Sequence, residues 1–509
     1  MPSSNKSDLA TRSVSAAAWN YLGTIVRAVL QFVTQIALAR LLGQEAFGIV
    51  TAALTILFLY ALIIELGLGS ALVQTAVVDD ATIQFVYTRI LAAATTGAVI
   101  IASCSEIVAS FFAEPDTSLV LRFMAIAFFI QGLGIVSLSL LRRELQHKAV
   151  QQAQLSGYIL GFVVVGITSA VAGAGVWSLV AAWLVQNIVT TCLLYRRIRH
   201  SVKLRCSPAG VSLQRFGMKV MATNLCNYLT ENIDRFFVGR YFGTATLGAY
   251  SVSYNLVRTP TNNIVTSLQQ VLFPAAARAR DQIASIQIAF LTSIWGVGLV
   301  TFAVFFSIAS IGDIFIVGLL GNEWQEASKF VMPLALAMPF HALMAVCGPI
   351  LWGRGAVSSE LSVQFGSAIA LVFVLFAASY SATAMAWGLF AVYVCRSLVM
   401  LAVIKRHLSL SKRQIAESVS PALLVSLVVA ASVWAAVKIS APHVSSHSQQ
   451  LLIGTAAGAI SWPTAFWAMG SRILPDTLVP ALQEFRLRRG ARVQQVTSRF
   501  FKSSKGMGK

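Results

Sequence analysis

The chain alternates between long apolar segments and short polar connections. Each apolar segment contains about 20 or more residues, the length that an α-helix needs to cross the hydrocarbon core of a bilayer. The segments are about twice as long as membrane β-strands and lack their alternating pattern, so helices are the predicted spanning elements. About fourteen such segments are predicted, at residues 14–39, 47–69, 84–109, 118–141, 154–173, 175–195, 213–238, 246–273, 285–308, 330–352, 361–381, 384–405, 418–438 and 449–470.

The composition excludes an ordinary soluble globular protein. Of the 509 residues, 57% are hydrophobic and only 11% are charged, and the mean hydropathy is +0.75. A soluble fold of this size needs more polar side chains to cover its surface. The six cysteines show no C-x-x-C spacing, which favours packing residues over disulfides or metal ligands. We therefore predict an all-α integral membrane protein without a metal site or a cofactor.

Positive charge is distributed unevenly along the chain. The 38 lysines and arginines outnumber the 19 acidic residues, and most of them fall in every second connection between apolar segments. Cytoplasmic connections are enriched in this way, so both termini are predicted to lie in the cytoplasm. The cytoplasmic parts include the leading tail 1–13, the basic linker 196–212 and the basic tail 471–509. The opposite side receives only Arg40, Arg240, Lys329 and Lys438.

A short pattern occurs twice in the chain, 200 residues apart. The pattern Arg-x-x-Gly-x-x-x-x-Gly begins at Arg40 and again at Arg240, at the ends of the first and seventh segments. An offset of six spans predicts two parallel, pseudo-symmetric six-helix halves related by an axis along the membrane normal. The halves are predicted at 14–195 and 213–405, with a central cavity between them. The last two helices, within 406–470, are then an appended pair.

Six arginines lie inside predicted spans. An arginine at the bilayer centre costs about 2.5–3.5 kcal/mol, so such residues are expected to face protein or water. Arg27 is near the middle of the first span, and Gln31 and Gln35 follow it on the same helical face, which predicts a cavity wall. Arginines near span ends can reach the interface equally well. The six are Arg27, Arg89, Arg122, Arg235, Arg258 and Arg396.

The seventh segment is the most polar of the fourteen. Glu231 and Arg235 are four residues apart, so they can form a local ion pair. Two interpretations of the segment stay open. Its polar groups either hold helices together or form a cavity wall that binds sugar hydroxyls or a coupling ion. The polar residues are Asn224, Asn227, Tyr228, Glu231, Asn232, Asp234 and Arg235.

The eighth segment adds further polar side chains, among them Tyr254, Asn255 and Arg258. Pro260 removes one backbone donor and predicts a kink near the middle of this segment. A kinked polar helix is tolerated in a membrane only where it is buried in protein or lines water. Pro260 is therefore interpreted either as the hinge of a moving element or as the site of a static kink.

These motifs resemble the polysaccharide flippases of the MOP superfamily. The resemblance covers residues 14 to about 470 and is closest to the Wzx-like and succinoglycan- or colanic-acid-type exporters. Gln44 stands where a proline is common in that family, and Glu65 stands where an aspartate is common. The motifs are ARLLG at 39–43, FG at 47–48, GLGSALVQ at 67–74, NIDR at 232–235, GR at 239–240, Gly243, LGAY at 247–250, LFP at 272–274 and LGNEW at 320–324.

The resemblance implies a bacterial inner-membrane flippase. Its implied substrate is an undecaprenyl-diphosphate-linked oligosaccharide, moved to the periplasmic leaflet for exopolysaccharide or lipopolysaccharide assembly. A polysaccharide polymerase and a chain-length regulator are possible protein partners. The basic tail 471–509 is predicted to bind anionic lipid, and nucleic-acid binding is not expected.

A cationic cleft is the mechanism that we expect for such a substrate. Arginines would replace the hydration of the diphosphate, while amides and Tyr254 would hold the glycan as the two halves rock. Carboxylates are candidates for coupling to H⁺ or Na⁺. The candidate substrate-binding residues are Arg27, Gln31, Gln35, Asn224, Asn227, Arg235, Tyr254, Asn255, Arg258 and Arg396. The candidate ion-coupling residues are Glu65, Glu231 and Asp234.

Three other functions stay open. A lipid II flippase shares the anionic head group, whereas a MATE-type multidrug antiporter would favour buried carboxylates over an arginine in the first span. A membrane-embedded polymerase or ligase is more distant, because the longest predicted outer loop covers only about 309–329. The sequence also contains no Walker A, nucleophile-elbow or H-E-x-x-H motif. We therefore expect a transporter and not an enzyme.

Overall fold

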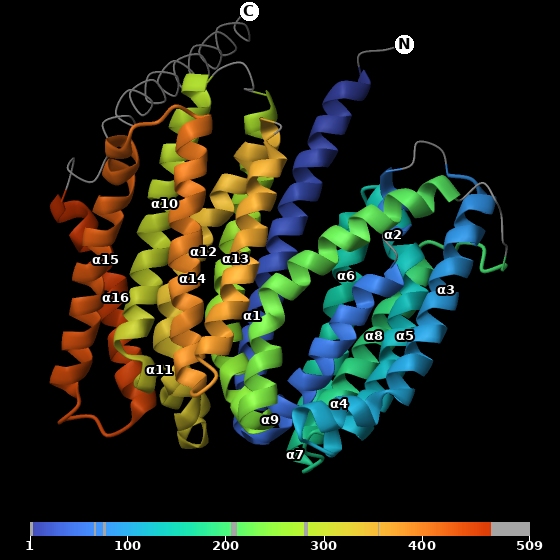
Figure 1. Ribbon diagram of the computed structural model, residues 1–509, viewed down its shortest axis with the longest axis horizontal. Coiled ribbons are helices and arrows are strands. Elements are labelled where there is room, and N and C mark those ends of the chain that lie inside the picture. The colour runs from blue at the N-terminus through green and yellow to red at the C-terminus, as the bar shows by residue number, and fades with distance from the viewer. Residues whose placement is uncertain are drawn as a thin grey trace, which may run out of the picture. The chain divides into compact units, whose positions relative to one another are not determined.

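The computed structural model describes residues 4–65, 68–74, 78–204, 211–278, 283–354 and 356–469 (Figure 1). This part of the chain is helical and contains no strand, which confirms the all-α prediction. The elements are α1 (Ser4–Glu65), α2 (Leu68–Gln74), α3 (Asp80–Ser103), α4 (Ser105–Phe112), α5 (Asp116–Arg143), α6 (His147–Tyr158), the π-helix η1 (Ile159–Gly166), α7 (Ile167–Val171), α8 (Trp177–Arg197), α9 (Val211–Arg278), α10 (Ile283–Ser310), α11 (Gly312–Leu320), the 3₁₀-helix η3 (Asn322–Trp324), α12 (Gln325–Gly353), α13 (Val357–Ala377), α14 (Ala382–His407), α15 (Lys412–Ser440) and α16 (His447–Met469).

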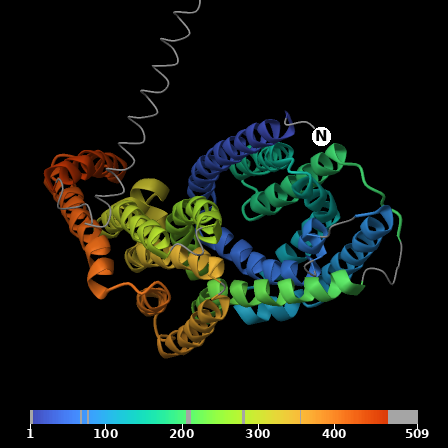
Figure 2. The same ribbon diagram turned by 90° about the horizontal axis from the view of Figure 1, so that it is seen from above.

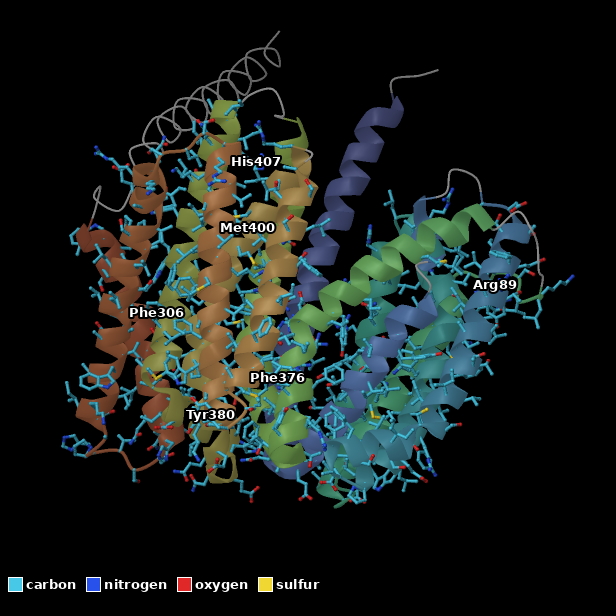
Figure 3. The ribbon with its side chains drawn as sticks, viewed as in Figure 1. Arg89, Phe306, Phe376, Tyr380, Met400 and His407 are labelled. Carbon is cyan, nitrogen blue, oxygen red and sulfur yellow. The ribbon has the colours of Figure 1, made fainter. Side chains whose placement is uncertain are left out.

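Eleven helical stretches of the described residues are long and apolar enough to cross a membrane. Their outer faces carry large exposed hydrophobic side chains, such as Phe376 of α13 and Tyr380 after it (Figure 3). Such faces suit contact with lipid, and the chain is a multi-pass membrane protein. The count of eleven does not test the prediction of about fourteen spans, because α1 contains two predicted segments and counts once.

The described helices form two compact units. Helices α9, α12, α13 and α14 each begin in one unit and end in the other. The two predicted halves of the chain therefore stay a prediction, since each unit is described here by itself. Unit 1 comprises Met1–Asn263, Gly312–Leu334 and Ala368–Leu389, and unit 2 comprises Ile264–Ile311, Ala335–Ser367 and Phe390–Lys509.

Helix α5 is central to unit 1, where it packs against α1, α3 and α8 (Figure 1). Leu121, Met124 and Phe128 recur at three- or four-residue intervals, so they share the helical face that enters the core. Small residues let these helices approach closely, as is typical of membrane proteins. A Cβ atom on Gly132 of α5 would lie only 2.8 Å from the Cβ atom of Ala94 in α3.

In unit 2, helices α10 and α16 both pack against α15 (Figure 2). Helix α15 begins with a capping box, in which the side chains of Ser411 and Gln414 bond each other's backbone N–H groups. The indole Nε1 of Trp462 in α16 donates to the carbonyl oxygen of Leu299 in α10 at 3.1 Å. Local sequence therefore starts α15, and contacts distant in sequence hold the unit together.

Two glycine kinks divide the longest helices. Gly43 in α1 has a φ of +73°, and Gly243 in α9 has a φ of +80°. Residues with a Cβ atom rarely adopt this left-handed conformation, which explains why glycine occupies both positions. Each kink separates two predicted spans, as the repeated pattern at Arg40 and Arg240 indicates.

The kinks bring the backbones of α1 and α9 into direct contact. A Cβ atom on Gly48 would lie 1.8 Å from the carbonyl oxygen of Thr244, and one on Gly248 would lie 2.0 Å from that of Gln44. The two contacts are equivalent under the 200-residue offset, and neither leaves room for a side chain. We call this place the kink crossing and define it by Gly43, Gly48, Gly243 and Gly248.

The repeated arginines hold the ends of two short helices beside the kink crossing. Arg40 donates from Nε and Nη2 to the carbonyl oxygens of Leu319 and Gly318, at 2.6 and 2.9 Å, where α11 ends. Arg240 donates from Nη1 to the carbonyl oxygen of Phe111 at 3.1 Å, where α4 ends. Cations satisfy the unpaired carbonyl groups at helix C-termini and complement the helix dipole. Both arginines of the repeat therefore have a structural role.

Candidate functional site

The first candidate cation lies on α1. Arg27 donates from Nη1 to the amide oxygen Oε1 of Gln154 in α6 at 2.6 Å. An amide oxygen carries no net charge, so this bond orients the guanidinium group without neutralising it. Arg27 forms no ion pair with any residue that the structure describes. Its positive charge is therefore available to a ligand.

Gln31 and Gln35, one and two helical turns after Arg27, line a cavity of about 370 Å³. This volume lies within the range of about 300–1,000 Å³ that small-molecule sites occupy. Amides can bond hydroxyl groups, and the aromatic rings in the wall offer flat apolar surfaces. We call it the amide cavity, and its polar and aromatic lining comprises Gln31, Phe32, Gln35, Phe47, Thr51, Tyr158, Phe162, Trp183, Asn255 and Thr259.

Two arginines of α9 flank one tyrosine ring. The guanidinium carbons of Arg235 and Arg258 lie 5.6 and 5.2 Å from the ring centroid of Tyr254, which is 1% exposed. The kink at Gly243 folds α9 back on itself and so brings these residues together. A cation over an aromatic face gains about 0.5–2 kcal/mol, which helps to hold two like charges close. We call Arg235, Tyr254 and Arg258 the Tyr254 cluster.

The charges of the two arginines are balanced differently. Arg258 forms an ion pair with Glu231, whose side chain is 47% exposed. Arg235 donates from Nη2 to the amide oxygen Oδ1 of Asn255 at 3.0 Å, and its Nε has no partner among the described residues. The local pair that the spacing of Glu231 and Arg235 allows is not formed, because Glu231 reaches across the folded helix to Arg258. The charge of Arg235 is not neutralised by an ion pair with a described carboxylate.

The candidate ion-coupling carboxylates are held by neighbours or lie outside the described residues. Asp234 is 2% exposed and accepts a hydrogen bond from the Tyr250 hydroxyl at 2.5 Å, while Glu231 is paired as above. The side chain of Glu65 lies outside the described residues. Within the described ranges, no group of three or more His, Cys, Asp or Glu side chains could hold a metal ion. A coupling role for these three carboxylates stays a prediction.

The roles predicted for the remaining site residues stay predictions. The side chains of Asn224 and Asn227, like the basic tail 471–509, lie outside the described residues. Arg396 lies on α14 in the part that belongs to unit 2, where it is 8% exposed. Pro260 lies inside α9, but the residue with non-helical backbone angles there is Gly243. A hinge at Pro260 stays a prediction.

A second cavity, of about 420 Å³, is one that sequence patterns do not indicate. On one side it is lined by α5, and on the other by Ala61 of α1 and by Gly69, Ser70 and Val73 of α2. Arg142 has the sequence position of an ordinary cytoplasmic charge, and only the packing of α2 on α5 brings Ser70 to the same wall. One signal is present in the sequence, because Gln131 is a polar residue in the middle of an apolar span.

Known sequences resemble the chain over most of its length. A family model described as polysaccharide biosynthesis protein matches residues 37–329. The lipopolysaccharide biosynthesis protein WzxC of Escherichia coli (strain K12) is 22% identical and aligns over 70% of this chain and 73% of its own length. The teichuronic acid biosynthesis protein TuaB of Bacillus subtilis (strain 168) is 24% identical, over 88% and 94%. The succinoglycan biosynthesis transport protein ExoT of Rhizobium meliloti (strain 1021) is 28% identical, over 68% and 69%.

Solved transporter structures share the fold. The lipid II flippase MurJ, in an inward closed conformation, aligns with a TM-score of 0.72 at 12% identity, over 88% of this chain and 99% of its own. An inward-facing multidrug resistance MATE family transporter of the MOP superfamily aligns with a TM-score of 0.61 at 14% identity, over 74% and 94%. At such identities the likeness shows the fold alone. The family follows from the model that matches more than half of the sequence, and the chain belongs to the polysaccharide biosynthesis protein family.

Proposed function

We propose that this protein moves an undecaprenyl-diphosphate-linked oligosaccharide across the bacterial inner membrane. The observation that carries the proposal is that Arg27 and Arg235 are each held by a neutral amide, so both keep a positive charge inside a helical bundle. A diphosphate cannot enter such an interior without cations that replace its hydration. The names of the three relatives, all proteins of polysaccharide biosynthesis, support the same class of substrate.

Different residues of the site bind the diphosphate and the glycan of this substrate. Arg27, Arg235 and Arg258 bind the diphosphate, and Arg258 exchanges its ion pair with Glu231 for one with phosphate. Guanidinium groups suit this role because they make paired, planar hydrogen bonds to phosphate oxygens. The amides and aromatic rings of the amide cavity hold the sugar units, while the lipid tail stays in the bilayer. Rocking of two helical halves then exposes the site to either side in turn.

The direction of transport follows from the charge of the substrate. With both termini in the cytoplasm, the arginine-rich connections lie on the inner side, as the positive-inside rule requires. An interior-negative potential then favours outward movement of an anionic head group by about 2.3 kcal/mol per charge per 100 mV. Glu231 and Asp234 are the described carboxylates that could link this movement to H⁺ or Na⁺. The product enters the outer leaflet, where a polymerase and a chain-length regulator would receive it.

Polymer export tests the proposal. The double variant Arg27→Ala/Arg235→Ala is expected to export at most about a tenth of the wild-type amount at equal protein level, because two charge-assisted contacts are lost. Arg89→Ala is the matched control, since Arg89 is exposed and lies over the ring of Phe85 in α3. Full export from the double variant would discard the cationic site.

A lipid II flippase is the second candidate function, favoured by the likeness of the fold to MurJ. The two substrates share a lipid diphosphate and differ in the glycan. Complementation separates the two functions. We expect the gene to restore polymer in a strain that lacks its exopolysaccharide flippase, but not growth in a strain depleted of its lipid II flippase. The opposite result would reassign the substrate and leave the diphosphate site in place.

A further inference from the structure

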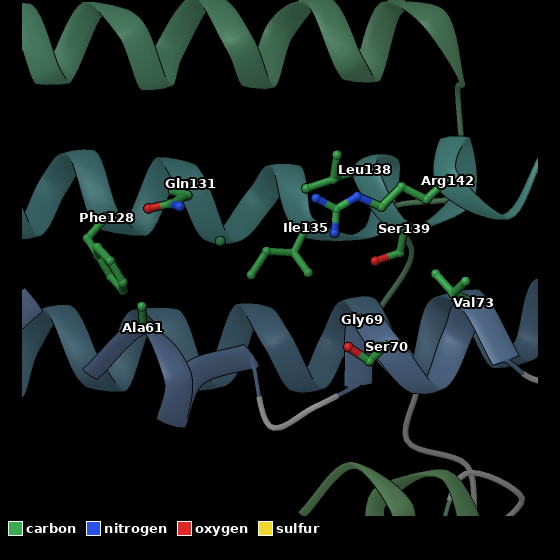
Figure 4. A pocket seen from close by; sticks show the side chains of 11 residues that line it. Ala61, Gly69, Ser70, Val73, Phe128, Gln131, Ile135, Leu138, Ser139 and Arg142 are labelled. Carbon is green, nitrogen blue, oxygen red and sulfur yellow. The ribbon is translucent and has the colours of Figure 1, made fainter. Parts of the chain in front are cut away.

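The second cavity is lined by both polar and apolar side chains (Figure 4). Gln131, Ser139 and Arg142 come from α5, and Ser70 comes from α2, while Phe128 and Ile135 supply apolar surface. Its volume of about 420 Å³ is enough for a phosphate group with an attached sugar-sized substituent. It shares no lining residue with the amide cavity. It is therefore a separate place on the molecule.

Arg142 is the one charged residue among the described residues that line this cavity. It makes no hydrogen bond or ion pair with a described residue. The adjacent Arg143 differs, because its Nη1 donates to the carbonyl oxygen of Leu72 at 3.2 Å and so ties α2 to α5. Arg143 therefore has a structural role, whereas the charge of Arg142 is not paired with a described residue. Among the described lining residues, Arg142 is thus a cation without a paired carboxylate, and such a group suits an anion.

One buried polar atom of the wall also lacks a partner among the described residues. Ser139 is 5% exposed and lines the cavity. The amide oxygen of Gln131 is buried and has no hydrogen-bond partner among the described residues. Buried polar groups are almost always hydrogen-bonded, and a turn of the Gln131 amide would bring this acceptor to a donor on a molecule in the cavity. A hydroxyl group is such a donor, and hydroxyls at Ser70 and Ser139 can in turn donate to an anion.

We propose that this cavity is a second phosphate-binding site, with a hydroxylated substituent of the ligand beside Gln131. Arg142 supplies the charge, Ser70 and Ser139 donate hydrogen bonds to phosphate oxygens, and Gln131 accepts one from a ligand hydroxyl. The phosphate belongs either to a lipid head group or to a soluble phosphate ester. The inference stands apart from the proposed transport function, because it uses none of the residues assigned to the central site.

Binding to the purified full-length protein in detergent tests this site. Labelled inorganic pyrophosphate and geranylgeranyl diphosphate are the probes, measured by equilibrium dialysis in the Arg27→Gln/Arg235→Gln background. That background removes the two central arginines held by neutral amides and leaves Arg258, which is paired with Glu231. The part of the remaining binding that Arg142→Gln removes therefore reports the second cavity. We expect one site per chain there, and we expect Arg142→Gln to weaken binding at least tenfold. Arg142→Lys keeps the charge and should retain part of the affinity.

Arg196→Gln is the control, because Arg196 is an exposed arginine at the end of α8 that does not line the cavity. Equal weakening by Arg196→Gln would reduce the effect to net charge and overturn the proposal, as would unchanged binding in Arg142→Gln. Ser139→Ala probes the same wall independently and should weaken the binding of both probes. Binding that persists undiminished in the Ser139→Ala/Arg142→Gln variant would place the phosphate elsewhere.

Two further comparisons identify the ligand. Geranylgeranyl diphosphate that binds at least tenfold tighter than pyrophosphate supports a lipid head group, and equal affinity supports a soluble ester. Gln131→Leu should weaken a nucleotide sugar such as UDP-glucose while leaving pyrophosphate unchanged. If wild type and the Arg27→Gln/Arg235→Gln background bind identically, the central site fails while the second cavity stands. Loss of all binding in that background would support the central site and overturn the second one.

Discussion

Tyr254 organises the candidate site at the scale of single residues. The guanidinium groups of Arg235 and Arg258 lie 5.6 and 5.2 Å from the centre of its buried ring, and the neighbouring Asn255 holds Arg235 through one hydrogen bond. Helical spacing predicts that Glu231 and Arg235 share a polar face, but it does not predict which cation Glu231 bonds. Glu231 lies four residues from Arg235 and still bonds Arg258, because the fold places that cation within reach.

Arg235→Lys tests whether the shape of the cation matters as well as its charge. A lysine ammonium cannot lie flat on Tyr254 and also bond Asn255 and a phosphate in one plane. We expect export to fall about tenfold at wild-type protein level, since one charge-assisted contact is worth roughly 1.5–3 kcal/mol. The measurement is exported polymer per cell, with Arg122→Lys as a control at the exposed pair with Glu106. Unimpaired export from Arg235→Lys would show that the charge at position 235 matters and the planar shape of the guanidinium group does not.

His200 gives the chain a pH-dependent contact outside the spans. Its Nδ1 donates to the carbonyl oxygen of Ser201, so Nε2 accepts from the Ser137 hydroxyl at 3.1 Å in the neutral ring. Burial lowers the pKa of His200 below its ordinary value of 6.5. Protonation would cost the Nε2 acceptor and leave a charge between the rings of Tyr87 and Tyr195. The contact is therefore stable in its neutral form.

Because the folded-state pKa is lowered, the stability from His200 is complete above about pH 6.5 and is lost as the pH falls through the folded value. We expect the melting temperature of the purified protein to fall between about pH 7.5 and about pH 5.5. His200→Gln should show a smaller fall over the same interval, because glutamine does not titrate. Equal falls in both proteins would remove His200 as the cause.

The kink crossing is a contact between two helices, α1 and α9. Gly48 and Gly248 are required because the backbones of α1 and α9 touch there, and Gly43 and Gly243 because the chain takes a left-handed turn. Repeated glycines at fixed spacing are visible in the sequence. The sequence does not show why these glycines are needed, since the backbones that touch are 200 residues apart in the chain.

Gly48→Ala and Gly248→Ala test this crossing. Each new Cβ atom would lie about 2 Å from a carbonyl oxygen, so the helices must separate. We expect each variant to lose at least about 1–3 kcal/mol of stability, the usual cost of overpacking, and to melt several degrees lower. Gly296→Ala in α10 is the matched control, because nothing lies within 4 Å of its Cβ position. Wild-type melting of Gly48→Ala would mean that α1 and α9 do not touch in this way.

At the scale of the whole molecule, two equivalent contacts hold one end of unit 1 together. Arg40 binds the end of α11 and Arg240 binds the end of α4. Thr244 adds a bond to Glu114 at 2.9 Å. A transporter that alternates between two openings must release such contacts during each cycle. The symmetric pair is therefore expected to stabilise the state in which α1 and α9 are crossed.

The double variant Arg40→Ala/Arg240→Ala should shift the population away from that state. Loss of two helix-end contacts of about 1 kcal/mol each changes the ratio of states by roughly tenfold or more. The parent protein for this test has its six native cysteines replaced and carries one new cysteine, Gln35→Cys. The rate at which an impermeant reagent added outside the cell labels that cysteine reports the ratio of the two states. We expect faster labelling than in the single-cysteine parent. Unaltered labelling at equal protein level would show that the two arginines only brace the fold.

Much of the architecture could be predicted from local pattern. Apolar length determines the spanning helices, lysine and arginine counts favour one orientation, and helical periodicity places Arg27, Gln31 and Gln35 on one face. These properties depend on residues close together in the chain. The positions of Gly43 and Gly243 are likewise encoded locally, because few other residues accept that backbone conformation.

The partners of the charged groups are decided only by tertiary structure. Glu231 pairs with Arg258, Arg40 binds α11, and Ser70 meets Arg142 across a cavity. Each of these contacts joins residues that lie on different helical arms. Electrostatic and hydrogen-bond energies depend on distance in space, and periodicity along one helix carries no information on which helix packs beside it. The sequence by itself therefore determined the helices and their polar faces, and the packing determined what those faces bind.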